Sequence, residues 1–384
     1  MPKGSFLIFC LIFIAIAFSL SATAALVPTI AEYFGVAKNI AVRLTWIYML
    51  PYGIFAFFWG PLSRSVTVKN LLLISIIGFS VSTLLFSVSQ SINQAFLFRF
   101  MMGCFGSGFV PLAFITIGKA VDSDKKAKHL GTFFALSTVS ACLGVFLSGF
   151  LPWRAIYLTP VVLCFFIFIL ILLYLEDFDF RGEKFKISYF ETFKDKQALR
   201  LFLAVGLGSF LFHGLQQNLG VYLSERFALR QVAISSIFTI STVCAIVIRF
   251  LGGFLSSTFG NIKITRIGYI SMSVFTAILL FSWQYQLIIL TIVFWGAGWA
   301  LSHTGLSAYL AHLPDKILRD ASSLNSSLRL GFGGLGAFFG SLLASSIIGF
   351  KILFFIMTII LFFLGFFMNR LLDNSTKTLK GQSH

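Results

Sequence analysis

Polar side chains interrupt an apolar stretch in the second half of this chain. His213, Gln216 and Gln217 share one side of a helix at their three- and four-residue spacing, and Asn218 is adjacent. Imidazole and amide groups donate and accept hydrogen bonds, and they are costly to bury without partners. We therefore expect His213, Gln216 and Gln217 to bind a polar solute. A hydrogen-bond cluster between helices is the alternative.

Two arginines and a second histidine also fall inside apolar stretches. Arg99 and Arg329 lie well within theirs, and His303 follows Trp299 by one turn. A guanidinium binds a carboxylate or phosphate through a two-pronged contact, and an indole ring forms an apolar or cation-π wall. We expect all four residues to contact solute. The alternatives are bonds from Arg99 to backbone carbonyls and packing of the tryptophan against lipid.

The buried charge is positive throughout. All 13 Asp and Glu residues fall in the connecting segments or at the ends of the apolar stretches. An anionic or zwitterionic solute is therefore favoured over a cation. Arg249 lies near the end of its stretch, where we expect its side chain to reach the membrane surface. With no buried acid, His213 and His303 are the candidates for proton coupling, which we expect to pass through His213.

The elements that must position these residues are membrane-spanning helices. Hydrophobic residues make up 58% of the 384 positions and charged residues 11%, and the mean hydropathy is +0.94. Apolar runs of about 20 residues, long enough to cross a bilayer as helices, recur along the chain. We expect an all-α polytopic membrane protein with spans at 5–31, 44–63, 70–90, 94–118, 130–152, 155–175, 199–223, 231–255, 265–283, 286–312, 321–347 and 350–370.

The cations predict the orientation of the chain. Most of the 29 lysines and arginines lie on the side that holds both termini, which the positive-inside rule assigns to the cytoplasm. These cations account for the net charge of +16 and meet anionic lipid headgroups, so nucleic acid is not an expected partner. The five cysteines lie inside spans without a CxxC pair, and neither a metal nor a cofactor is expected.

The chain carries an internal duplication. A shift of 193 residues lays Ala31–Val36 on Ser224–Leu229 and Gly60–Ser63 on Gly253–Ser256, and a shift of 192 lays Gly144 on Gly336. We expect two six-helix halves with a solute site between them. The halves are placed at 1–175 and 199–373, with a cytoplasmic linker at 176–198 and a cytoplasmic tail at 374–384.

These features resemble the major facilitator superfamily, and within it the twelve-span exporters of drugs and solutes. The resemblance rests on Pro28–Val36 ending span one, Gly60–Ser63 after span two, Arg99-x-x-x-Gly103-x-x-Gly106 in span four and Trp153-Arg154 after span five. It implies alternating access, in which the two halves rock around a central site. Members commonly work as monomers, so a monomer is expected.

The resemblance also identifies a gate after span two. Gly60, Leu62 and Lys69 match the family pattern, but Arg64 stands where the family has a latching acid. In the second half Gly253, Leu255 and Gly260 remain, and Ser257 replaces the acid. Gly144 of the span-five signature is present without its usual proline. The ionic latch of the family is thus expected to be lost.

We interpret the protein as a secondary transporter of a small organic solute in the cytoplasmic membrane. Export of an anionic or zwitterionic metabolite is preferred, and multidrug efflux, an uptake permease and a non-transporting sensor are the alternatives, in that order. An enzyme is not favoured, because neither HExxH nor GxSxG occurs and neither buried histidine has an acid nearby in sequence.

Overall fold

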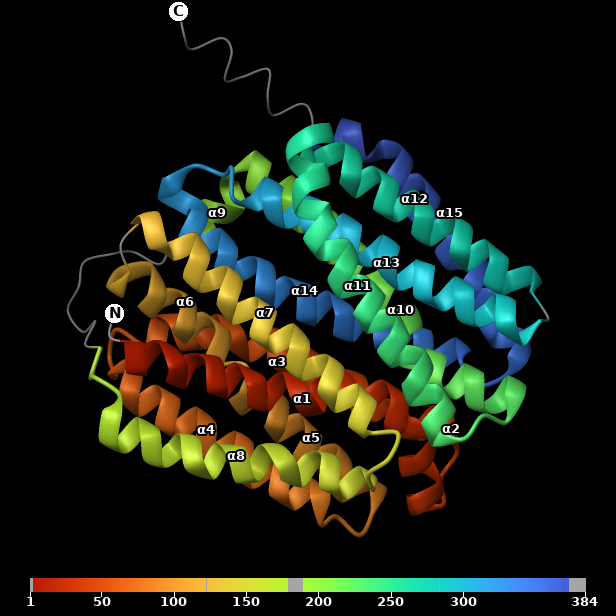
Figure 1. Ribbon diagram of the computed structural model, residues 1–384, viewed down its shortest axis with the longest axis horizontal. Coiled ribbons are helices and arrows are strands. Elements are labelled where there is room, and N and C mark those ends of the chain that lie inside the picture. The colour runs from red at the N-terminus through yellow and green to blue at the C-terminus, as the bar shows by residue number, and fades with distance from the viewer. Residues whose placement is uncertain (1–2, 122, 179–188, 283, 373–384) are drawn as a thin grey trace, which may run out of the picture.

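The computed structural model describes residues 3–121, 123–178, 189–282 and 284–372, and there the chain is built from helices (Figure 1). In chain order they are α1 (Lys3–Phe34), α2 (Lys38–Ala41), α3 (Arg43–Leu62), α4 (Val68–Ser87), α5 (Ile92–Gly106), α6 (Phe109–Ala120), α7 (Ser123–Leu147), α8 (Trp153–Tyr174), α9 (Tyr189–Lys194), α10 (Lys196–Phe227), α11 (Gln231–Phe259), α12 (Asn261–Phe281), α13 (Tyr285–Leu310), α14 (Asp315–Leu343) and α15 (Ile347–Leu372).

The all-α membrane fold is confirmed. Each expected span falls on one long helix, except that the fourth is divided into α5 and α6. The break lies at Ser107 and Gly108, where the Trp59 indole donates a hydrogen bond of 2.9 Å to Ser107 Oγ and packs against Gly108. Among the described residues, ten of the spans are long and apolar enough to cross a membrane by length and composition, and α7 contains a shorter apolar stretch, Gly131–Leu147.

The duplicated segments make the same contact in each half. A Cβ added to Gly144 of α7 would collide with the carbonyl oxygen of Phe18 in α1. A Cβ added to Gly336 of α14 would collide with the carbonyl oxygen of Phe210 in α10. Both glycines and both phenylalanines are related by the shift of 192 residues found in the sequence. Glycine is required here because the two backbones are too close for any side chain.

Buried side chains form two hydrophobic clusters that follow these halves. One cluster contains Tyr48, Phe79 and Tyr157 and draws on helices α1 and α3 to α8. The other contains Tyr269 and Phe354 and draws mainly on α10 to α15, with one side of α1 packed against it. The exact limits of the halves stay a prediction, because residues 179–188 of the linker and 373–384 lie outside the described residues.

Hydrogen bonds and an ion pair join the halves on the side away from α9, which we call the opposite side. Thr29 Oγ1 donates to Gln231 Oε1 at 2.7 Å, and the hydroxyls of Ser148 and Ser235 lie 2.9 Å apart. Lys38 Nζ of α2 pairs with Glu225 Oε1 of α10 at 2.8 Å. These contacts close the opposite side of the molecule.

Breaking the Lys38–Glu225 pair is expected to loosen this closure. In a cysteine-substituted protein carrying Ala31→Cys, a site buried at the opposite side, Lys38→Gln should raise the rate of maleimide labelling about two- to fivefold. The faster labelling would reflect a larger fraction of protein molecules that are open on that side, because the Lys38–Glu225 ion pair forms only in the closed state. The charge-reversed double variant Lys38→Glu with Glu225→Lys should restore slow labelling. An unchanged rate in the single variant would show that the pair does not hold this side closed.

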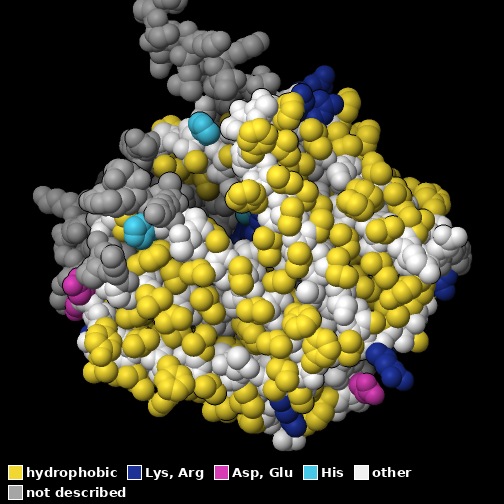
Figure 2. All heavy atoms as spheres, viewed as in Figure 1, with side chains coloured by type: hydrophobic (Ala, Val, Ile, Leu, Met, Phe, Trp, Pro, Cys, Tyr) yellow, Lys and Arg dark blue, Asp and Glu magenta, His cyan; other side chains and the backbone are white. Residues whose placement is uncertain are grey.

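On the side of α9, which we call the linker side, α7 and α11 leave a hollow between them. Figure 2 shows this hollow, with arginine or lysine and histidine atoms at its bottom. By contrast, the hydrogen bond between Ser148 and Ser235 holds the opposite-side end of α11 against the segment that follows α7. The structure is therefore closed on the opposite side and hollow on the linker side.

Candidate functional site

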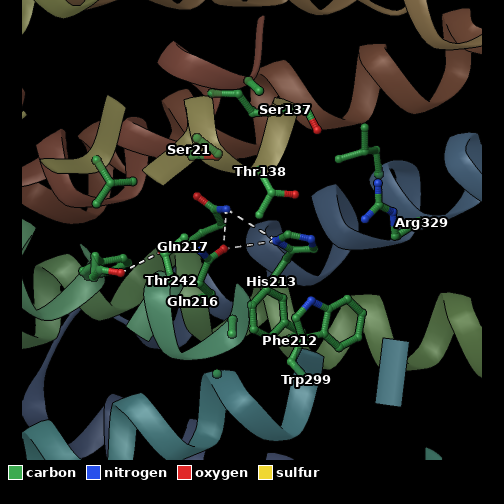
Figure 3. Close-up of a pocket in the computed structure, with 18 of the residues that line it drawn as sticks. Ser21, Ser137, Thr138, Phe212, His213, Gln216, Gln217, Thr242, Trp299 and Arg329 are labelled. Atoms are coloured by element: carbon green, nitrogen blue, oxygen red, sulfur yellow. Dashed lines mark hydrogen bonds between the residues drawn. The ribbon is translucent and has the colours of Figure 1, made fainter. Parts of the chain in front are cut away.

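A cavity of about 270 Å³ lies between the two halves (Figure 3). Helices α1, α3, α6 and α7 of the first half and α10, α11, α13 and α14 of the second contribute side chains to it. Polar residues of α7 and α14 are part of this lining, among them Ser137, Thr138, Ser326 and Arg329. A cavity wall is a place where polar groups are tolerated at membrane depth.

The polar group predicted on α10 lines the cavity as a connected set. Gln217 Nε2 donates to Gln216 Oε1 at 2.9 Å, and His213 Nδ1 lies 3.3 Å from Gln216 Oε1 and 3.4 Å from Gln217 Nε2. Figure 3 shows the three side chains joined in this way. Asn218 does not belong to the set, because it is buried and donates to the Gly214 carbonyl at 2.8 Å.

An aromatic stack forms one wall of the cavity. The Phe212 ring lies between the indoles of Trp295 and Trp299, at centroid distances of 4.7 and 4.4 Å and interplanar angles of 11° and 10°. All three residues line the cavity. Trp299 thus lies on the cavity, and its contact with solute stays a prediction. Phe212 was missed, because the abundance of phenylalanine in spans hides the one ring that stacks between two tryptophans.

Arg329 of α14 also lines the cavity, and His303 of α13 positions it. Arg329 Nη1 donates to His303 Nε2 at 3.3 Å, and His303 Nδ1 lies 3.5 Å from Ser307 Oγ. Because a guanidinium donates only, Nε2 must accept, so this ring is neutral with its proton on Nδ1. His303 is absent from the cavity lining as described, and it therefore contacts Arg329 rather than solute in this arrangement.

Arg249 of α11 is a second guanidinium on the cavity, which corrects the expectation that it reaches the membrane surface. It interacts electrostatically with Arg329. Its position near a helix end suggested snorkelling, but the splaying of α7 from α11 leaves this end facing the hollow. Sequence reasoning gave no signal of this, because a helix end is equally close to headgroups and to a cavity mouth.

Two buried hydrogen-bond donors of the lining have no partner among the described residues. They are Nε1 of Trp295 and Nε of Arg249. Among the described residues that line the cavity there is no Asp or Glu. The site is thus rich in donors and in positive charge, and it lacks an internal anion. Such a site favours a ligand that brings acceptors and negative charge.

Hydroxyl groups complete the wall that faces α10. Ser21 of α1, Ser137 and Thr138 of α7 and Thr242 of α11 line the cavity (Figure 3). Sequence reasoning did not single them out. A serine or threonine inside a span commonly donates to the carbonyl one turn earlier, as Thr138 does to Phe134 at 2.8 Å, and the sequence does not distinguish such residues from lining ones.

Arg99 does not line the cavity, and this corrects the expectation that it contacts solute. The side chain is 0% exposed inside the first half. Its Nε donates to the Leu44 carbonyl at 3.0 Å, its Nη2 donates to Thr23 Oγ1 at 3.3 Å, and its guanidinium carbon lies 4.5 Å from the Tyr48 ring centroid. Arg99 is therefore the structural arginine, bound to a backbone carbonyl, that the sequence left as its alternative.

The expected gate residues of the first half lie at the linker side. Gly60 is buried near the end of α3, and its carbonyl accepts from Ser63 Oγ at 2.7 Å. Leu62 is exposed, and Lys69 Nζ donates to the Leu172 carbonyl at 3.2 Å within the same half. Lys69 therefore fastens α4 to α8 and does not bridge the halves.

Arg64 lies where α9 meets α14. The Tyr189 phenol interacts electrostatically with Arg64 of the first half and Asp320 of the second, and it hydrogen-bonds to Ser323. Burial raises the pKa of the Tyr189 phenol above its usual value, which favours a neutral hydroxyl here. The linker side is thus joined through the tyrosine of α9, although the family's latching acid is missing.

The gate residues expected in the second half have simpler roles. Gly260 forms the turn between α11 and α12 with φ of +89°, a conformation that favours glycine. A side chain at Gly253 would meet no neighbour, and Leu255 is half-buried. That these residues take part in gating stays a prediction.

Comparison with known proteins agrees with this architecture. Over 126 residues the chain is 31% identical to the uncharacterized MFS-type transporter YceJ of Bacillus subtilis, covering 33% of this chain and 32% of the relative. Over 195 residues it is 30% identical to the multidrug resistance protein MdtG of Klebsiella pneumoniae, covering 48% of this chain and 47% of that one. The aligned parts thus span about a third to a half of these relatives.

A solved structure matches over nearly the full length. The inward-facing, unoccupied structure of a bacterial homologue of the human lysosomal transporter Spinster superposes with a TM-score of 0.73 at 15% identity, covering 98% of both chains. At this identity the likeness shows the fold alone. The sequence itself matches the Major Facilitator Superfamily over residues 7–330, which is most of its length. The chain therefore belongs to the Major Facilitator Superfamily, a family of secondary transporters for small solutes.

Proposed function

We propose that this protein exports an organic anion, or a zwitterion with an exposed anionic group, across the cytoplasmic membrane. The observation that carries the proposal is the cavity between the halves, where Arg249, Arg329 and the free donor of Trp295 meet no carboxylate among the described lining. The stacked rings of Phe212, Trp295 and Trp299 favour a solute with a flat apolar body beside its anionic group.

Export is proposed as the direction because the relative MdtG is named a multidrug resistance protein. The linker side carries most of the cations and is assigned to the cytoplasm by the positive-inside rule. In this orientation the hollow between α7 and α11 (Figure 2) lies toward the cytoplasmic ends of these helices, and solute would load there. We propose a multi-pass protein of the inner membrane that works as a monomer, because each chain already supplies both walls of the cavity.

Multidrug efflux is the second candidate. MdtG is named a multidrug resistance protein, and the aromatic wall suits lipophilic compounds of varied shape. A buried acid would offset the charge of a lipophilic cation, but the described cavity lining has two guanidiniums, which repel it. Within multidrug efflux, anionic and neutral amphipaths are therefore favoured over cations.

Calorimetric titration of the purified protein tests the charge preference. Three probes share one ring system: naphthalene-2-sulfonate is an anion, 2-naphthol is neutral at pH 7, and naphthalen-2-ylmethylammonium is a cation. We expect the affinity order anion, then neutral, then cation, because only the anion offsets the charge of Arg249 and Arg329. Tighter binding of the cation than of the anion would overturn the proposal.

A further inference from the structure

The cavity holds two positive charges that the described protein groups leave without a counterion. Arg249 and Arg329 approach from different helices and interact electrostatically. Their described neighbours in the lining are uncharged hydrogen-bonding groups such as Tyr52, His213, Gln216 and Ser326. His303 does not offset the charge either, because it accepts a hydrogen bond from Arg329 as a neutral ring.

This arrangement affects the step in which the empty cavity must close. While the cavity is open, water and salt ions screen the two guanidiniums. During alternating access the cavity is closed on both sides of the membrane before it opens on the second side. This closure removes the screening and strengthens the repulsion between the two guanidiniums. Buried charges that lack a partner are strongly unfavourable, whereas a bound anion supplies the missing partner. The loaded carrier therefore crosses the closed state more easily than the empty one.

We infer that this protein is an anion exchanger: outward movement of one organic anion requires return of a second anion in the same cavity. The inference rests on the proposed function, since it assumes that the solute is an anion. Export of the solute would then be coupled to the return of the counter-anion. Exchange of two anions of equal charge moves no net charge across the membrane. The returning species is a small anion that binds in the cavity beside Arg249 and Arg329, such as a carboxylate or inorganic phosphate.

Proteoliposomes test the inference directly. Entry of radiolabelled naphthalene-2-sulfonate is measured into vesicles that contain either unlabelled naphthalene-2-sulfonate or sucrose in zwitterionic buffer alone. We expect entry at least tenfold faster into the anion-loaded vesicles. Vesicles loaded with inorganic phosphate or with chloride identify the kind of anion that supports return. A fifth set without internal anion carries an imposed pH gradient, and its flux should stay at the background of protein-free vesicles.

The charge argument is tested by removing one guanidinium. Arg249→Gln leaves a single positive charge in the cavity, so the rate into empty vesicles should rise relative to the exchange rate. Equal rates in loaded and empty vesicles, or flux driven by the pH gradient alone, would overturn exchange. If calorimetry still shows anion binding in that case, export of an anion stands and exchange alone fails. If naphthalene-2-sulfonate neither binds nor moves, both proposals fail.

Discussion

Arg329→Gln is expected to lower the transport efficiency, kcat/KM, for naphthalene-2-sulfonate by about 10- to 100-fold. Hydrogen bonds to a charged group contribute about 1.5–3 kcal/mol each, and each 1.4 kcal/mol is a tenfold change. Glutamine keeps hydrogen-bonding capacity beside His303 but supplies no charge to the anion. The measurement is initial-rate exchange in proteoliposomes, at matched protein content.

Two control variants sharpen this result. Arg329→Lys keeps the charge and loses the planar fork, so we expect an intermediate loss. Arg43→Gln removes an exposed arginine at the start of α3, outside the described cavity lining, and should transport normally. A normal rate for Arg329→Gln would show that this guanidinium is no part of the solute site.

Arg99→Ala is expected to destabilise the protein rather than to alter solute recognition. The change leaves a cavity in the first half and removes bonds to the Leu44 carbonyl and Thr23 together with the stack on Tyr48. Deleting a large buried side chain costs about 2–5 kcal/mol, and lost charge-assisted hydrogen bonds add to it. The apparent Tm in detergent should fall by about 5 °C or more.

The contrast between the two arginines is the informative part of this experiment. Arg329→Gln should leave the apparent Tm within about 2 °C of the parent, because its side chain faces a cavity. Arg99→Ala protein that remains folded at low temperature should bind naphthalene-2-sulfonate with unchanged affinity. If Arg99→Ala instead keeps its Tm and loses anion binding, the original expectation of a solute-binding Arg99 is restored.

The loss of the family's latching acid also acquires a structural meaning. Sequence comparison within the chain showed Arg64 in place of the acid but could not show what replaced the latch. In the structure Tyr189 of α9 interacts with Arg64, Asp320 and Ser323, and we propose that these interactions take the place of the latch. Nothing in the composition of the linker marks this tyrosine, because its role depends on where α9 docks against α14.

The sequence by itself determined the membrane class, the twelve spans and the duplication. Hydropathy is a local property of about 20 consecutive residues, so it is readable without knowing any neighbour. The paired glycines Gly144 and Gly336 are readable for a related reason, because repeated helix contacts require the same small residue in each half. The polar group on α10 followed from helical spacing alone.

Only the tertiary structure decided which buried cations face the solute. Arg99 and Arg329 both lie well inside apolar spans, and the spacing of their neighbours does not separate them. Arg99 is turned into the first half by Tyr48 and the Leu44 carbonyl, whereas Arg329 is held at the cavity by His303. The rotation of a helix in a bundle is set by the helices packed around it, which come from distant parts of the chain. For that reason the sequence predicted a positively charged pathway, and the fold selected Arg249 and Arg329 to line it.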